Sequence, residues 1–220
     1  MGSIGIVGET SSTVDLVWQA IGIGERVASA VLLGAISPVL GASAVAVSLL
    51  SRRTPLIAHR RVGWCGSTLW MLKLRTMWDQ DSTRTGEGSR WIEYVYDDQG
   101  AENKHDSDPR VTHWFARFCR RHSLDEIPQL WHVISGEMSL VGPRPLTATE
   151  LDRHYGAAAG EILQVRPGLV GLWQVSGHNR LSYAERRALD LKLVRGRSLL
   201  MYLQVLLHTI PEVLRGTNSW

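Results

Sequence analysis

Hydrophobic positions form one uninterrupted block near the N-terminus and shorter periodic stretches further along the chain. From Val27 to Ser51 there is no charged residue over 25 positions, and the polar residues are only Ser and Gly. About 20 such residues in a helix are enough to cross the hydrocarbon core of a bilayer. A buried helix of a soluble protein, the alternative interpretation, usually keeps a polar face. The block therefore indicates a membrane helix.

Ser37 and Pro38 lie near the middle of this block. Proline removes a backbone donor and clashes with the preceding turn, so we expect a kink there. A helix broken at this depth could enter and leave the membrane on the same face. The flanking charges allow a spanning helix instead, since Arg52 and Arg53 follow the block and would place its C-terminal end in the cytoplasm. The residues alone leave both topologies open.

Charge is unevenly distributed after this block. Residues 52–77 contain six cations and no acid, whereas residues 78–109 carry a net charge of −6. Trp64 and Trp70 are interleaved with the cations, a composition that suits an anionic headgroup surface or a phosphate-bearing substrate. Nucleic-acid binding and an ordinary solvated basic face are the competing interpretations. The adjacent apolar block favours the membrane interpretation.

The rest of the chain predicts a mixture of short strands and helices. The acidic segment 78–109 reads as a loop with a short strand around Trp91–Tyr96. The stretch 198–210 reads as an apolar or amphipathic helix ended by Pro211, lying either in the membrane interface or in the core. Further expected elements are a helix over Val111–Arg121, a strand over Leu172–Val175 and a helix opened by the capping box Ser182–Glu185.

The overall composition predicts one packed domain. The 220 residues are 44% hydrophobic with a net charge of +3, which argues against disorder. The two cysteines are far apart, and the eight histidines lack the spacing of a zinc site. The positions of these residues therefore argue against a disulfide framework and against a zinc site.

The densest chemical signal is the adjacent pair Asp125 and Glu126. Ser123 and Glu126 have the spacing of a helix-capping box, but Pro128 would then stand in the second turn of the helix, which argues against simple capping. Nearby arginines would keep the two carboxylates ionised, so that they could bind a divalent cation or supply a nucleophile for phosphorus. Both interpretations stay open at this point.

Arg144 stands between two prolines in the segment Gly142-Pro143-Arg144-Pro145. The prolines fix the backbone on both sides, so the guanidinium is presented with little conformational entropy to lose. Such a segment could hold Arg144 against a phosphate, or it could be a rigid turn whose Arg144 forms a surface salt bridge.

These residues, taken together, resemble a known family. The segments KLRTM (73–77), SLDEIPQLWHVISGEMSLVGPRPL (123–146) and VRPGLVGLWQVSGHNRLSYAERRALDL (165–191) are similar to those of the bacterial sugar transferases, monotopic polyprenyl-phosphate phosphoglycosyl transferases. The resemblance covers about residues 24–216. It implies a mixed α/β, mainly helical, monotopic membrane protein with a re-entrant helix broken at Ser37-Pro38 and interfacial amphipathic helices.

The resemblance also implies a reaction. Asp125 would attack the sugar-bearing phosphorus of a UDP-sugar and release UMP, and polyprenyl phosphate would then take the phosphosugar from the enzyme. Glu126 would assist as the second carboxylate, with Mg²⁺ held by Asp125 and Glu126. The substrate-binding residues implied are Lys73, Arg75, Arg120 and Arg144.

The domain organisation and location follow from the same resemblance. We expect an N-terminal tail at residues 1–23, a re-entrant membrane helix at 24–53 and a cytoplasmic catalytic domain at 54–220. The protein would lie on the cytoplasmic face of a bacterial inner membrane, with UDP-sugar and polyprenyl phosphate as partners, no nucleic acid, and a homodimer left open.

Two positions depart from the family pattern. Tyr202 stands where the family typically has Asp, and Ala28 and Ser29 stand where an Asp is usual after the start of the membrane helix. Tyr202 motivates an alternative function, in which a non-catalytic relative binds UDP-sugar or lipid phosphate as an assembly partner.

Overall fold

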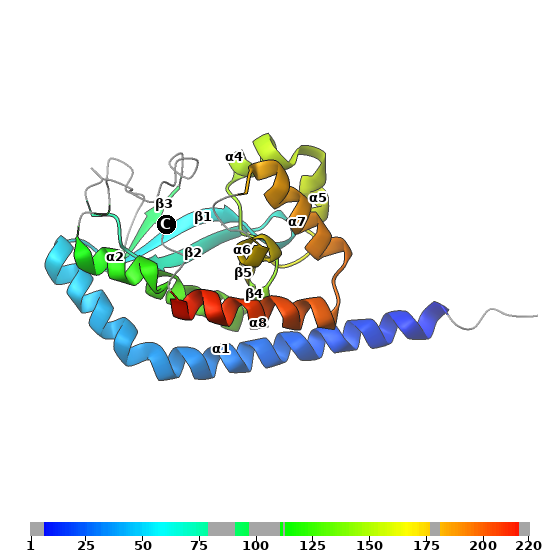
Figure 1. Ribbon diagram of the computed structural model, residues 1–220, viewed down its shortest axis with the longest axis horizontal. Coiled ribbons are helices and arrows are strands. Elements are labelled where there is room, and N and C mark those ends of the chain that lie inside the picture. Colours follow the sequence, from blue (N-terminus) through cyan, green and yellow to red (C-terminus); the bar gives the residue numbers. More distant parts are fainter. Residues whose placement is uncertain (1–6, 79–90, 97–110, 112, 177–180, 216–220) are drawn as a thin grey trace, which may run out of the picture.

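The computed structural model describes residues 7–78, 91–96, 111, 113–176 and 181–215. Its longest element is helix α1, Val7–Ser51, which runs along one side of the rest of the chain and bends in its second half (Figure 1). Pro38 lies inside the helix, and the Ser37 hydroxyl donates a 2.8 Å hydrogen bond to the carbonyl of Gly34. A proline interrupts the backbone hydrogen bonds of a helix and kinks it. The observed bend of α1 is therefore consistent with the kink expected at Ser37-Pro38.

Helix α1 begins well before residue 24, so part of the segment expected to be a tail is helical. The part from Leu16 to Ser51 is long and apolar enough to cross a membrane, by length and composition. Large aliphatic side chains such as Val31 and Leu49 are exposed, at 69% and 74% of their surface. Other α1 side chains, among them Glu25 and Val47, are buried against the domain. The helix therefore has a side that packs on the domain and an apolar side that the protein leaves uncovered.

A three-stranded sheet follows α1 in the order β2-β1-β3. Strands β1 and β2 are antiparallel, with Leu56 opposite Leu74, while β1 and β3 are parallel. The short strand expected around Trp91–Tyr96 is confirmed as β3. The bounds are β1 Leu56–Val62, β2 Thr68–Leu74 and β3 Ile92–Val95, with a 3₁₀ turn η1, Trp64–Gly66, between β1 and β2.

Three short helices follow the sheet in the chain and pack against both β2 and α1. The helix predicted over Val111–Arg121 begins three residues later, since His113 occupies the N-cap and its side chain accepts from the backbone of Phe115. Val47 of α1, Leu74 of β2 and Cys119 of this helix form one buried cluster. The elements are α2 Trp114–Arg121, the 3₁₀ helix η2 Leu124–Gln129 and α3 Leu130–Ser135.

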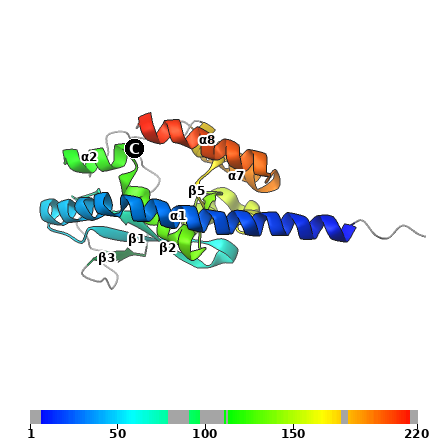
Figure 2. The ribbon, with the colours of Figure 1, turned by 90° about the horizontal axis from the view of Figure 1, so that it is seen from below.

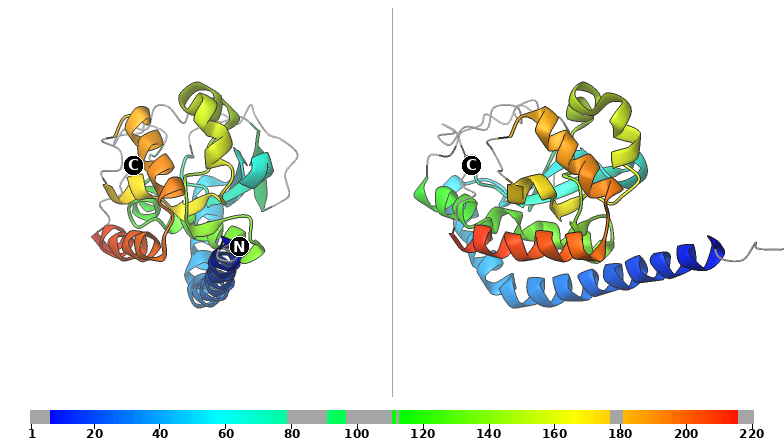
Figure 3. Two further views of the ribbon diagram at one scale, coloured as in Figure 1. Left: turned by 90° about the vertical axis from the view of Figure 1, so that its right-hand side faces the viewer. Right: turned by 45° about the vertical axis from the view of Figure 1, so that its right-hand side comes forward.

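Two short parallel strands, β4 and β5, pack unusually closely. A Cβ atom added to Gly168 would lie 2.0 Å from the backbone nitrogen of Gly142, so no side chain fits between the two segments. Figure 3 shows the small helices stacked above them. The elements are β4 Ser139–Val141, α4 Ala148–Glu150, the π-helix η3 Leu151–Tyr155, the 3₁₀ helix η4 Gly156–Ala158, α5 Ala159–Ile162 and β5 Gly168–Val170.

The last three helices are α6 Leu172–Ser176, α7 Tyr183–Arg195 and α8 Leu199–Arg215. The strand expected over Leu172–Val175 is wrong, because this segment is helical and the preceding residues form β5 instead. The capping box Ser182–Glu185 is confirmed. Pro211 does not end α8. It is exposed, so solvent can satisfy the carbonyl that loses its donor, and the helix continues.

Helices α1 and α8 lie on the same side of the molecule, with α1 outermost (Figures 1 and 2). Helix α8 buries Tyr202 and Val205 toward the domain and exposes a row of aliphatic side chains. One face of α8 therefore packs as a core helix does, while the other face leaves the apolar surface that an interfacial helix would need. The exposed aliphatic residues of α8 are Leu199, Leu200, Leu203, Leu207 and Ile210.

Candidate active site

The adjacent carboxylates Asp125 and Glu126 lie on η2, a tight helix that packs against strand β2. The preceding residue Ser123 adopts a left-handed conformation, with φ of 53°, and its side chain makes no capping bond. The capping-box interpretation of Ser123 is therefore wrong, as Pro128 indicated. The left-handed residue turns the chain sharply between α2 and η2, and this turn directs Asp125 inward, where it is buried.

Lys73 and Glu126 form an ion pair, with 2.7 Å between Nζ and Oε1. Both side chains are partly buried, so water screens the pair less than it would an exposed one. Lys73 comes from β2 and Glu126 from η2, and their pairing explains how the Lys-x-Arg segment meets the carboxylate pair in space. The sequence did not predict this ion pair, and a contact of Lys73 with substrate stays a prediction.

Burial raises the pKa of Asp125 to about 6. The Lys73 and Arg120 cations act in the opposite direction and favour the carboxylate, while Glu126 adds repulsion. The Oδ1 atom of Asp125 is buried, and no residue in the described part of the chain donates a hydrogen bond to it. A carboxylate with an oxygen that the protein does not engage, held among two cations, is suited to reacting with an electrophile or binding a cation.

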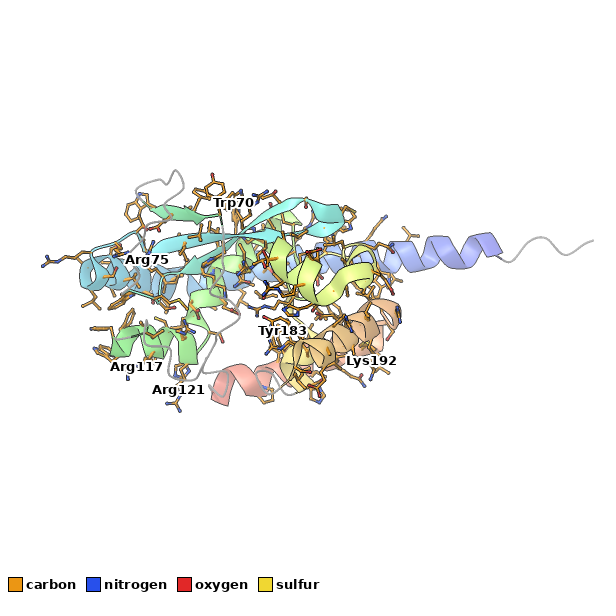
Figure 4. All side chains as sticks on the ribbon, turned by 90° about the horizontal axis from the view of Figure 1, so that it is seen from above. Trp70, Arg75, Arg117, Arg121, Tyr183 and Lys192 are labelled. Carbon is orange, nitrogen blue, oxygen red and sulfur yellow. The ribbon has the colours of Figure 1, made fainter. Side chains whose placement is uncertain are left out.

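The structure does not bring Arg75 into this cluster. Its guanidinium donates to the Thr54 carbonyl at 2.8 Å and to the Thr54 hydroxyl at 2.9 Å, and it pairs with the Glu93 carboxylate. Figure 4 shows Arg75 near the sheet and, separately, Arg117 and Arg121 on α2. Arg75 therefore holds β2, β3 and the segment after α1 together, and its contact with substrate stays a prediction.

Arg144 lies in a second cluster, built around the fully buried Asp190 of α7. The backbone N–H of Arg144 donates to the Asp190 carboxylate, and the Tyr155 hydroxyl donates to Asp190 Oδ2 at 2.7 Å. The Arg144 guanidinium lies over the ring of Trp173, 5.6 Å from its centroid, and that of Arg186 lies 4.8 Å from the same ring. Two cations on one indole make a strongly electropositive surface.

Burial raises the pKa of Asp190 to about 7, with Tyr155 and the two arginines opposing the shift. The sequence analysis treated this segment as scaffold and missed Asp190. A signal was present, since Asp190 interrupts an apolar stretch between Leu189 and Leu191 on a helix. An acid flanked by leucines in this way is more often engaged by a partner than solvated. The partner, Arg144, could not be inferred because it is distant in the chain.

Tyr202 is engaged by a carboxylate of helix α1. Its hydroxyl donates to Glu25 Oε1 at 2.6 Å, and the same oxygen accepts from the Ser139 hydroxyl at 2.7 Å and from the Leu140 backbone at 2.9 Å. Glu25 therefore provides a buried carboxylate on α1, three positions before Ala28. Tyr202 therefore has a structural partner here, and its presence does not by itself argue against catalysis.

A divalent cation would find limited ligands in the protein alone. In the part of the chain that the structure describes, no three His, Cys, Asp or Glu side chains are gathered as a metal site. Asp125 and Glu126 nevertheless provide adjacent carboxylates, one with an unpartnered buried oxygen. Mg²⁺ is often held by one or two carboxylates together with substrate phosphates and water. The residues therefore fit a magnesium ion that a diphosphate substrate completes.

Comparison with known proteins places nearly the whole chain in one group. Residues 20–216 match the model of the family described as bacterial sugar transferase. The chain is 43% identical over 162 residues to the exopolysaccharide production protein ExoY of Sinorhizobium fredii, covering 74% of this chain and 71% of that protein. It is 35% identical over 203 residues to the UDP-glucose:undecaprenyl-phosphate glucose-1-phosphate transferase of Caulobacter vibrioides, covering 88% and 69%.

A third relative is longer. The chain is 38% identical over 194 residues to the UDP-galactose-lipid carrier transferase of Erwinia amylovora. The matched region covers 86% of this chain but only 40% of that protein.

Proposed function

Since this chain belongs to the bacterial sugar transferase family, we propose that it transfers a sugar 1-phosphate from a UDP-sugar to polyprenyl phosphate and releases UMP. The names of its relatives from Caulobacter vibrioides and Erwinia amylovora support this reaction class. The observation that carries the proposal is Asp125, a buried carboxylate with an unpartnered oxygen beside Lys73, Arg120 and Glu126. The sugar and the length of the lipid are not part of the proposal.

In the first step, an oxygen of ionised Asp125 attacks the phosphorus that carries the sugar. The bond from that phosphorus to the bridging oxygen of the diphosphate breaks, and UMP leaves with the bonding electron pair. Asp125 then holds the sugar phosphate as an acyl phosphate. In the second step, an oxygen of polyprenyl phosphate attacks the same phosphorus, which frees Asp125 and gives the polyprenyl diphosphosugar. One site can thus serve a soluble and a lipid substrate in turn.

The residues of the two clusters have distinct roles in this scheme. Lys73 and Arg120 favour the ionised form of Asp125 and stabilise phosphate charge. Arg144, whose backbone is held by Asp190, would contact the diphosphate. Mg²⁺, held by Asp125 and Glu126, would offset the charge of the diphosphate as UMP departs.

The membrane arrangement belongs to the same proposal. The bent, apolar α1 would enter and leave the membrane on the cytoplasmic face, with the exposed aliphatic row of α8 lying in the interface. The bend of α1 and the uncovered apolar surfaces of both helices support this. The test is a single cysteine before residue 24 in a protein whose Cys65 and Cys119 are replaced. We expect labelling only from the cytoplasmic side, and periplasmic labelling would establish a spanning helix.

The reaction is tested by incubating purified protein with several UDP-sugars, Mg²⁺ and polyprenyl phosphate while following UMP. We expect EDTA to stop UMP release and excess Mg²⁺ to restore it. Without the acceptor lipid, intact-mass measurement should detect one sugar phosphate on the protein, located by peptide mapping to Asp125. Asp152→Asn, an exposed carboxylate elsewhere, is the control. UMP release that persists in Asp125→Asn would contradict the covalent scheme.

A further inference from the structure

A pocket lies between α1, α8 and the segment leading into β5, and no side chain of the two clusters described above lines it. Apolar side chains line much of it, including Val141, Leu193 and Met201, and Trp18 closes the side formed by α1. Two arginines, Arg166 and Arg197, also line it. A pocket that combines apolar walls with two cations has the composition of a site for an amphiphilic anion.

Each of the two guanidiniums is placed against an indole. Arg197 lies 3.8 Å from the ring centroid of Trp18, and Arg166 lies 5.0 Å from that of Trp64. Stacking on an aromatic face fixes a guanidinium and leaves its edge N–H groups available for hydrogen bonds. The arrangement therefore presents two oriented cations to the same pocket.

At least one N–H group of these two arginines lacks a hydrogen-bond acceptor in the described part of the chain. The Nε atom of Arg166 is buried without a hydrogen-bond partner in the described part of the chain. Burial and the neighbouring Arg166 lower the pKa of Arg197, so the charged form is held at a cost. Glu25 is the one carboxylate that acts on Arg197 in the described structure, and its Oε1 atom already accepts three hydrogen bonds. An anion in the pocket would supply the missing acceptor and lower that cost.

The location indicates which anion this is. The pocket opens beside α1 and α8, whose uncovered aliphatic side chains mark the membrane side of the molecule, and both indoles suit the headgroup region of a bilayer. None of the residues gathered around Asp125 lines the pocket, neither Lys73 nor Arg120 nor Glu126. The pocket is thus separate from the reacting centre, which favours a lipid of the surrounding bilayer over the substrate.

We propose that the pocket formed by Trp18, Arg166 and Arg197 binds the phosphodiester headgroup of an anionic membrane phospholipid. The phosphate would accept from Arg166 and Arg197, and an acyl chain would lie along the apolar surface of α8. The bound lipid would join α1 to α8 at the membrane surface. This site rests on the membrane association proposed above, but it is independent of the transfer reaction.

The test measures lipid binding to delipidated full-length protein in a non-ionic detergent, in the absence of nucleotide sugar. Dioctanoyl phosphatidylglycerol is titrated against the wild type, against Arg166→Gln/Arg197→Gln and against Arg195→Gln. Arg195→Gln is the matched control for Arg197→Gln and removes one of the two charges lost in the double variant, from a neighbouring position that is exposed and paired with Glu161. Dioctanoyl phosphatidylcholine, inorganic phosphate and polyprenyl phosphate are titrated in parallel.

We expect phosphatidylglycerol to bind the wild type and the control roughly tenfold more tightly than phosphatidylcholine, a preference that falls below about twofold in the double variant. An equal preference in the double variant would overturn the proposal. So would displacement of phosphatidylglycerol by an equimolar amount of polyprenyl phosphate, or inorganic phosphate binding as tightly as the lipid. If circular dichroism shows that the double variant is unfolded, Arg197→Gln alone must lower the preference at least about threefold. UMP assays on the same samples report separately on the transfer reaction.

Discussion

The hydroxyl of Tyr202 donates a 2.6 Å hydrogen bond to Glu25, joining two helices whose residues are 177 positions apart. Both side chains are buried, and the ring of Trp18 packs edge-on against that of Tyr202, with 6.3 Å between centroids. The pair therefore ties α8 to α1 through a hydrogen bond between two buried side chains. A phenol suits this position, because it reaches a carboxylate without adding a second negative charge.

Replacing Tyr202 tests this pairing. We expect Tyr202→Phe to lower the free energy of unfolding by about 1.5–3 kcal/mol, the usual range for a hydrogen bond to a charged group. Tyr202→Asp should destabilise more, because it places a second carboxylate beside Glu25. Thermal unfolding in detergent micelles measures both. Equal midpoints for wild type and Tyr202→Phe would mean that the hydrogen bond contributes nothing to stability.

Activity should depend on pH through Asp125. The nucleophile must be ionised, and burial raises its pKa to about 6. UMP release should therefore be low at pH 5, rise through about pH 6 and level off above pH 7. Lys73→Met removes a cation that favours the ionised form, so its rising limb should move to higher pH. Arg121→Gln, an exposed cation on α2, should leave the profile unchanged.

Asp125→Asn should abolish transfer and stabilise the fold. A raised pKa in the folded protein means that ionisation of Asp125 opposes folding, so its unfavourable contribution is absent below about pH 4 and complete above about pH 6. At pH 7.5 the neutral amide should raise the free energy of unfolding, on the order of 2 kcal/mol. Unfolding curves at pH 7.5 and pH 4 measure this. A variant less stable than the wild type at pH 7.5 would show that the carboxylate is stabilising after all.

Asp190 should affect substrate binding through Arg144. Asp190→Asn keeps the side-chain shape but weakens the acceptor that holds the Arg144 backbone and the Tyr155 hydroxyl. Burial raises the pKa of Asp190 to about 7, so the neutral variant should remain folded at pH 8. We expect KM for the UDP-sugar to rise roughly tenfold, about 1.4 kcal/mol, with a smaller change in kcat. Asp152→Asn should change neither constant.

The contact between Gly142 and Gly168 predicts a strong effect from one methyl group. In Gly168→Ala the new Cβ would meet the backbone of the neighbouring strand at 2.0 Å, so β4 and β5 must separate. We expect a loss of about 3 kcal/mol or more, or failure to fold. At Gly160 an added Cβ meets nothing within 4 Å, and Gly160→Ala should be nearly neutral. Expression and thermal midpoints of the two variants provide the comparison.

Much of the local structure could be predicted because its causes are local. The apolar block, its Ser37-Pro38 interruption and the Ser182 capping box depend on neighbouring residues, and the structure has a helix at each. The strand expected over Leu172–Val175 failed because a short apolar run is compatible with either state, and tertiary packing chose a helix. Pro211 failed as a helix end because an exposed helix can tolerate the lost donor.

In the candidate site, too, the features with local causes could be predicted and the contacts between distant residues could not. Asp125 and Glu126 were recognisable as adjacent residues, whereas the ion pair between Glu126 and Lys73 was not predicted, because the two residues are 53 positions apart in the chain. Asp190 and Glu25 were missed because their partners, Arg144 and Tyr202, come from other parts of the chain. The partners of Arg75, Thr54 and Glu93, could not be inferred for the same reason, and its contact with substrate stays a prediction.

The packing of α1 has a practical consequence for producing a truncated protein. Along its length the helix contributes Glu25 to β4 and Val47 to the cluster around Leu74 and Cys119. A shortened chain that begins after Ser51 would lose the acceptor of Tyr202 and expose the apolar surface that Val47 covers. Removing α1 should therefore yield an aggregating chain, and the smallest stable unit of this transferase includes its long apolar helix.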